Sequence, residues 1–173
     1  DKTGTLTVFF SDQLIREISQ QGDIMEEEFI ERQIITGMIV SNEVCSQLSQ
    51  VLDKHCLESN SAYLLATWIR EYWNEWKKAP GRDIERVFTE KLQNGLTKDR
   101  ATDIEEILEG LSQDHDEEDF NSAYLLKIAT KHFDKNRWIA HAQAIQNAAE
   151  NGDFEGLEQL QKDRSEERRV GKE

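Results

Sequence analysis

Proline, cysteine and long apolar runs are scarce in this chain, and each scarcity excludes a class of protein. One proline and nine glycines among 173 residues are too few for a disordered linker. The two cysteines, Cys45 and Cys56, do not form a disulfide framework, so we expect both to be reduced and buried. The longest apolar stretches, such as Ile34 to Val40, are shorter than the roughly 18 residues that cross a bilayer. We therefore expect no membrane-spanning segment.

Basic residues are also few relative to acidic ones. The chain has 21 Lys and Arg against 35 Asp and Glu, which gives a formal net charge of −14. Affinity for nucleic-acid phosphates depends on clustered Lys and Arg, so this charge argues against a main DNA-binding surface. We expect the partners of this chain to be proteins.

The first residues, DKTGTLT, match the phosphorylation signature of P-type ion pumps, in which the aspartate accepts a phosphoryl group. That chemistry needs a buried parallel strand before Asp1, a later lysine and an acidic Mg²⁺ site. The sequence contains no TGDN, no GDGxND and no alternation of strands and helices. We expect residues 1–10 to be an atypical leader outside the fold, and a phosphoryl-transfer fragment that uses Asp1 is the enzymatic alternative.

The last ten residues, Arg164 to Glu173, match one reading-frame translation of a common short-read sequencing adapter. We therefore expect residues 163–173 to be an artefactual tail, and the domain itself to span residues 11–162. The first residue is not Met and no signal peptide follows it, which is typical of an internal fragment.

Apolar residues recur at helical spacing from Ser11 onward, and no segment alternates as a half-buried strand does. The pattern predicts an all-α fold, a compact bundle of about six to eight helices that ends in an α-hairpin. Two helices carry clear stripes. In the segment 25–41 the stripe is Phe29, Ile30, Gln33, Ile34, Gly37 and Met38. In the segment 120–153, capped by Asn121 or Ser122, it is Leu125, Ile128, Ala129, His132 and Phe133, continued by Ile139, Ala142, Ile145 and Ala149.

Two helices are rich in large aromatic residues, which are typical of both cores and protein interfaces. The predicted interface residues are Trp68, Tyr72, Trp73 and Trp76 on one helix and Phe133 and Trp138 on another. These rings could also stack on bases, as in single-strand binders, but the interleaved Glu71 and Glu75 favour protein packing.

Histidine, cysteine and carboxylate clusters give weak metal signals. His55 and Cys56 are adjacent and have no second pair at zinc-site spacing, and the patch Asp114 to Asp119 lacks the spacing of a calcium loop. His132 and His141 are nine residues apart, which favours packing or surface roles. We expect no metal, cofactor or catalytic residue here.

Three segments together resemble the N-terminal region of phage-type and DnaB-like replicative helicases, from about Glu28 to Gln161. FIERQIITGMIVSNEV is similar to the opening helix of that family, and YLLATWIREYWNEWKKAPG to a long helix that leads into a G-K-A-P-type turn. EEDFNSAYLLKIATKHFDKNRWIAHAQAIQNAAENGDFEGLEQL resembles the helix pair that precedes the linker to the ATPase domain.

This resemblance implies a collar or docking domain that supports ring assembly and binds primase or a helicase loader in the cytoplasm. ATP and Mg²⁺ would belong to a motor domain with a phosphate loop, and this chain contains no such loop. A stand-alone acidic helical protein-interaction domain is the remaining alternative.

Overall fold

The structure, a computed structural model, describes residues 26–113 and 121–170, the last four by their backbone alone. Asp1, the helix expected after Ser11 and the acidic patch from Asp114 to Asp119 lie outside the described residues. Expectations about those segments stay predictions.

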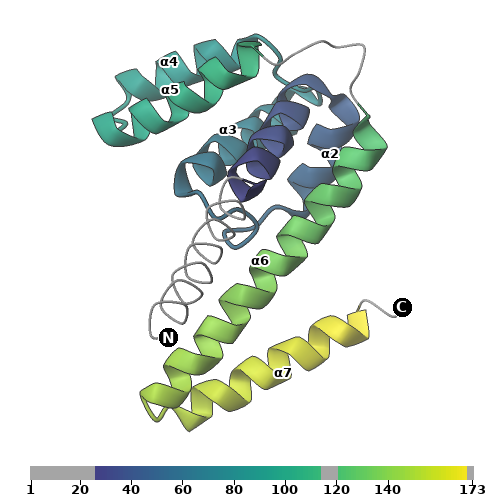
Figure 1. Ribbon diagram of the computed structural model, residues 1–173, viewed down its shortest axis with the longest axis vertical. Helices are drawn as coiled ribbons and strands as arrows, with labels where there is room; N and C mark the ends of the chain where they lie inside the picture. The colour runs from purple at the N-terminus through teal and green to yellow at the C-terminus, as the bar shows by residue number, and fades with distance from the viewer. Residues whose placement is uncertain (1–25, 114–120, 171–173) are drawn as a thin grey trace, which may run out of the picture.

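Every secondary-structure element in the described part is a helix. The first covers residues 26–40. It is followed by α2 (Asn42–Val51), α3 (Asn60–Trp76), α4 (Asp83–Gln93), α5 (Lys98–Gln113), α6 (Ser122–Glu150) and α7 (Phe154–Val170). The prediction of an all-α bundle that closes with a helical hairpin is confirmed (Figure 1).

Short polar side chains begin three of these helices by accepting a backbone N–H of the first turn. The Ser41 hydroxyl accepts from the Val44 amide, that of Ser59 from Ala62, and the Asn121 carbonyl from Tyr124. The hexapeptide NSAYLL occurs at the start of both α3 and α6. Its asparagine is the cap only in α6, because in α3 the preceding Ser59 takes that role.

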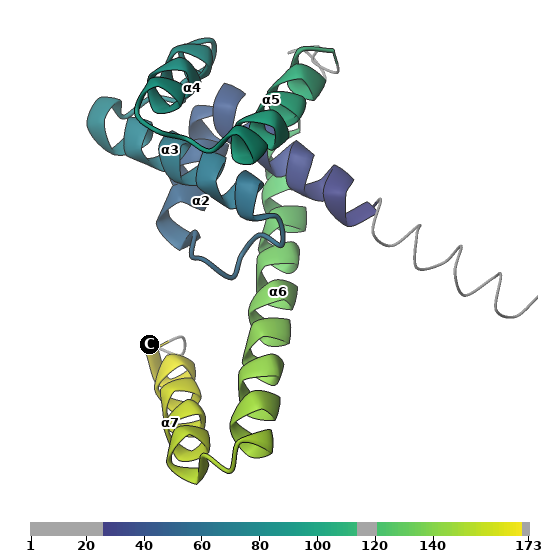
Figure 2. The same cartoon turned by 90° about the vertical axis from the view of Figure 1, so that its left-hand side faces the viewer.

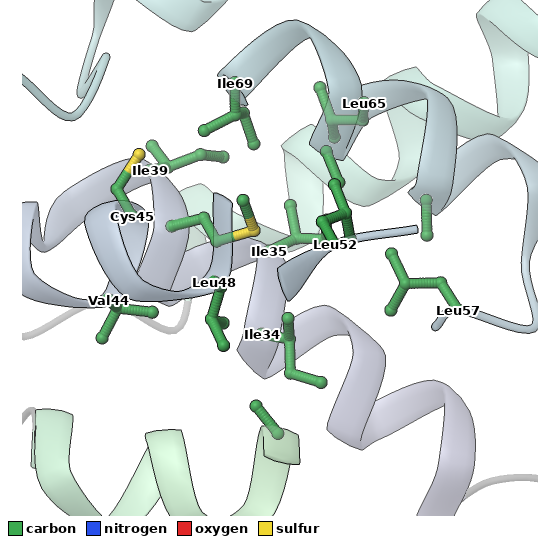
Figure 3. Packing of buried hydrophobic residues seen from close by; sticks show 14 of the residues in the cluster. Ile34, Ile35, Ile39, Val44, Cys45, Leu48, Leu52, Leu57, Leu65 and Ile69 are labelled. Atoms are coloured by element: carbon green, nitrogen blue, oxygen red, sulfur yellow. The ribbon is translucent and has the colours of Figure 1, made fainter. Parts of the chain in front are cut away.

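The core lies where the helix over 26–40, α2 and α3 meet, and side chains from all three point toward one another (Figure 3). Its fully buried members include Ile34, Ile35, Met38, Val44, Leu48, Leu65 and Ile69. Cys45 and Cys56 are buried free thiols, as the sequence predicts, and burial raises the pKa of Cys45 to about 11.

The stripe predicted for the helix over 26–40 is only partly correct. Ile34 and Met38 are buried, but Phe29 is exposed, and Ile35, Ile39 and the carboxylate of Glu31 are buried instead. The helix is covered by α3 on one side and α6 on another, so its buried surface is wider than a single stripe.

The turn after α3 folds back on the end of the first helix. Lys77 ends α3 with φ 52°, and Gly81 follows with φ 53°, a left-handed conformation that favours glycine. The Ala79 amide donates to the side chain of Asn42 at 2.8 Å, and the Gly81 amide donates to Ile39 O at 2.8 Å. These bonds hold the turn between α3 and α4 against the end of the first helix and the start of α2.

One helix, α6, belongs to two parts of the molecule. Its first half packs on α2, and its second half runs beyond the bundle beside α7 (Figures 1 and 2). We call residues 26–113 and 121–137 the head, and residues 138–170 the hairpin. In the described ranges no helix is long and apolar enough to cross a membrane.

Candidate protein-interaction surfaces

Apolar contacts fix the first half of α6 on the head. Leu125, Ala129 and Phe133 are buried at i, i+4 and i+8, and Phe133 is only 1% exposed. This spacing places the three side chains on one face of the helix. The hairpin therefore projects from a firmly packed base.

A buried carboxylate joins three segments beside this base. Glu31, 5% exposed, accepts hydrogen bonds from the backbone amides of Glu58 and Ser59, which lead into α3. Nε2 of buried His132 lies 3.6 Å from Glu31 Oε1 and 3.1 Å from the amide nitrogen of Asn136. Asn136 also donates to Cys56 O at 2.9 Å. The first helix, the loop before α3 and α6 thus share one polar network.

The guanidinium of Arg137 on α6 donates hydrogen bonds to the C-terminal end of α2. Arg137 donates from Nε to Asp53 Oδ2 at 2.8 Å and from a terminal nitrogen to Val51 O, while Arg70 donates to Leu52 O at 3.0 Å. Cations at a helix C-terminus satisfy its free carbonyls and favour its dipole. This contact orients α6 at the point where it leaves the head.

Asp53 makes this contact dependent on pH. Desolvation raises the pKa of Asp53, but hydrogen bonds from the His55 amide and from Arg137 outweigh it, so the net pKa is lowered. A lowered pKa stabilises the fold above the unfolded value near 3.8, and this contribution is lost as pH falls through the folded value.

We therefore expect Asp53→Asn to lower the free energy of unfolding at pH 7 by up to about 1 kcal/mol, since the pair is partly exposed. The difference from wild type should shrink as pH falls below about 4. Urea titrations of both proteins at pH 7 and pH 3 measure it. An equal difference at both pH values would contradict the assignment to the Asp53 charge.

The hairpin has no core of its own. Among the described side chains, none of α7 and none of α6 beyond Phe133 is buried. Large apolar side chains are exposed there instead: Trp138 (55%), Ile139, Ile145 and Phe154 (74%). Two helices that pack without burying any side chain gain little stability from each other.

The exposed apolar residues of α6 lie on a different side of the helix from the buried ones. Trp138, Ala142, Ile145 and Ala149 recur at i, i+4, i+7 and i+11, which is a single stripe. Trp138 follows Phe133 by five positions, about 140° around the helix axis. The stripe predicted to continue from Phe133 therefore does not continue on the same side. We call Trp138, Ala142, Ile145 and Ala149, with Phe154, the hairpin face.

A groove of about 680 Å³ separates the two helices of the hairpin near the head. Trp138, His141, Ala144 and Leu160 line it, and the guanidinium of Arg164 lies over the Trp138 ring, 3.2 Å from its centroid. Arg164 belongs to the expected artefactual tail, through which α7 continues.

A second groove, of about 590 Å³, lies between α3 and α4. Trp68, Tyr72 and Trp76 line its α3 side, and Asp83 and Glu90 its α4 side. The Tyr72 hydroxyl donates to Asp83 at 2.7 Å, and this bond raises the pKa of Tyr72. The rings of Tyr72 and Trp76 are tilted by 40° with centroids 6.3 Å apart. We call this the aromatic groove.

The six residues predicted for an interface divide into three groups. Trp68 and Phe133 are buried in the head, and Trp73 packs against its core. Tyr72 and the 62% exposed Trp76 lie in the aromatic groove, and exposed Trp138 lies on the hairpin. The two helices therefore present separate surfaces rather than one.

The sequence pattern did not indicate the roles of Glu31 or of the contact between Arg137 and Asp53. Arg137 and Asp53 are 84 positions apart, and Glu31 follows a run of acidic residues that is typical of a solvated helix face. The one available signal was a carboxylate three positions before buried Ile34, on the inner side of its helix.

No group of three or more His, Cys, Asp or Glu side chains that could hold a metal occurs in the part of the chain that the structure describes. Comparison with known proteins gives no family: no protein-family model, no curated protein and no solved structure matches this chain.

Proposed function

We propose that this chain is a non-catalytic assembly and docking domain, of the kind that precedes the motor of a replicative DNA helicase. In this proposal the hairpin joins copies of the chain into a ring, and the head carries the docking site for primase or a loader. The motor, with its ATP and Mg²⁺, would be a separate domain in the cytoplasm.

The observation that supports this proposal is the hairpin. It projects from the head, buries no side chain in its described part, and carries an apolar stripe on one side of α6. Apolar surface of this kind on a soluble domain is typical of a protein interface. The resemblance to the helicase family implies a helix pair at this position of the chain, and the structure has one.

A second copy of the chain is the partner that best suits the hairpin face. The stripe is uncharged along Trp138, Ala142, Ile145 and Ala149, so two copies can pack without bringing like charges together. Small alanines between large residues let two helices approach closely, and matching stripes pack ridge into groove. With a net charge of −14, an uncharged face brings less repulsion to self-association than an acidic one.

We expect the 173-residue chain to form a dimer or larger assembly, and Ile145→Glu to shift it to a monomer. A carboxylate in the middle of an apolar interface should weaken association at least about tenfold. Sedimentation velocity across a concentration series measures the mass. Gln143→Glu adds the same charge on an exposed position of α6 outside the stripe and should leave the mass unchanged.

If the wild-type chain is a monomer at high micromolar concentration, or if both variants dissociate equally, the hairpin face does not mediate assembly.

The proposed helicase context is tested separately, by the genomic sequence beyond Gln161. A phosphate loop within roughly 50 residues supports a motor domain. An unrelated domain or a stop codon favours the stand-alone interaction domain.

A further inference from the structure

The aromatic groove contains a cation site that the chain itself occupies. The ammonium of Lys91 on α4 lies 5.8 Å from the centroid of the Trp68 ring and 3.2 Å from Glu71 Oε2. Trp68 and Glu71 are three positions apart on α3, so a ring face and a carboxylate meet on one side of the helix. Such a pair attracts a cation through the ring quadrupole and the carboxylate charge together.

The same arrangement occurs again one turn further along α3. Tyr72 follows Trp68 and Glu75 follows Glu71, each by four positions, and all four line the same groove. Trp76 adds a second ring beside Tyr72, with centroids 6.3 Å apart. In the described part of the chain no basic side chain forms an ion pair with Glu75. The second ring and carboxylate therefore have the same spacing on α3 as the first pair, but no ion pair among the described residues involves Glu75.

The charges around this second position favour a basic occupant. The groove is lined by the carboxylates Glu71, Glu75, Asp83 and Glu90 and by the cations Arg86 and Lys91. Lys91 is already paired with Glu71, and Asp83 accepts from Tyr72. Outside these pairs the lining keeps two exposed carboxylates, Glu75 on α3 and Glu90 on α4, against one exposed cation, Arg86, so its remaining charge is negative.

We infer that the aromatic groove is a docking site for a basic segment of another protein, which inserts a Lys or Arg side chain between Tyr72, Glu75 and Trp76. A helical or extended segment with a Lys or Arg beside an apolar residue fits it, because three aromatic rings and four carboxylates line the groove. A groove of about 590 Å³ holds a few side chains of such a segment rather than a folded domain.

Nucleic acid is the other class of ligand that stacks on exposed rings. Its phosphates would meet Glu71, Glu75 and Glu90 in a chain that carries a net charge of −14. Base stacking in single-strand binders is accompanied by basic side chains that track the backbone, and here the balance is reversed. The charge complementarity thus favours a basic peptide.

This site deepens the docking role in the proposed function and rests on it, but it is independent of the hairpin face. The test uses the 173-residue chain and a fluorescein-labelled helical peptide of about 15 residues with a Lys and a Leu in every turn. Fluorescence anisotropy at low ionic strength should show saturable binding. A peptide with Glu in place of Lys should not bind.

Two variants locate the binding. Trp76→Ala should weaken peptide binding about fivefold by removing the exposed ring, and Glu75→Lys about tenfold by reversing the charge beside it. Both side chains are exposed, so circular dichroism should show an unchanged fold. Glu105→Lys, the same charge change on an exposed position of α5, and Tyr124→Ala, on an exposed ring of α6, should stay within about twofold of wild type.

Four results would overturn this inference: no binding of the Lys peptide, equal weakening by Glu75→Lys and Glu105→Lys, displacement of the peptide by a single-stranded oligothymidylate, or a lower assembly mass for Trp76→Ala. The last would assign the groove to contacts between copies. Failure of the proposed self-association is distinguishable, because it appears in the mass of the wild-type chain and leaves peptide binding intact.

Discussion

Phe133→Ala is expected to cost about 3–5 kcal/mol of the free energy of unfolding, because the ring is 1% exposed and its loss leaves a cavity. Phe133 is the last buried residue of α6 before the hairpin projects. The substitution therefore removes the apolar contact that holds the base of the hairpin. For a small domain with a total stability of about 5–15 kcal/mol, this is a large fraction.

Urea denaturation followed by tryptophan fluorescence measures this effect, since Trp68 lies in the head. Tyr124→Ala is the matched control: it removes an aromatic ring from the same helix at a position that is 62% exposed. It should change stability by no more than about 0.5 kcal/mol. Equal losses for the two variants would show that α6 does not pack on the head through Phe133.

Glu31→Ala is expected to destabilise the fold by about 3 kcal/mol. The substitution leaves the amides of Glu58 and Ser59 without their acceptor and removes the buried carboxylate beside His132. Glu31→Gln keeps one oxygen acceptor at that position and should cost less, about 1 kcal/mol. The order of the two variants tests whether the carboxylate acts by accepting backbone hydrogen bonds.

Glu28→Ala is the control for this pair, since Glu28 is an exposed glutamate one turn earlier on the same helix. It should stay within about 0.5 kcal/mol of wild type. Amide hydrogen exchange adds a local readout, because the amides of Glu58 and Ser59 should exchange faster in Glu31→Ala. A loss of stability without faster exchange there would contradict the proposed contact.

The contacts of Phe133 and Glu31 hold the base of α6 on the head. Phe133 packs in the apolar core, His132 lies beside the Glu31 carboxylate, and Arg137 bonds to the end of α2. In the proposed assembly this base sets the position of the hairpin relative to the head. The substitutions that loosen it should therefore also weaken assembly, whereas Ile145→Glu should weaken assembly and leave the head stable.

The surfaces proposed for assembly and for docking lie on different elements, and this makes them separable. Ile145 is on the hairpin, and Trp76 and Glu75 are on α3. Variants of the hairpin face should change the assembly mass and leave peptide binding unchanged. Variants of the aromatic groove should weaken peptide binding and leave the assembly mass unchanged. Sites without shared contacts are expected to act additively.

The amino-acid sequence by itself determined the helices. The spacing of apolar residues and the cap at Asn121 are local signals. The first helix, over 26–40, and α6 therefore lie close to the predicted segments 25–41 and 120–153. The closing hairpin was predictable for the same reason, since Gly152 with φ 68° follows a long periodic segment. Local propensity and capping act within a few residues, so one sequence is sufficient to read them.

Only the tertiary structure decided which apolar residues are covered. Phe133 and Trp138 are five positions apart on one helix, yet one is in the core and the other is exposed, because α6 leaves the head between them. The sequence pattern shows that a side chain is apolar, but it does not show which side chains pack against it. The same applies to Glu31. Its buried carboxylate accepts a hydrogen bond from the Glu58 amide in the loop before α3, 27 residues away.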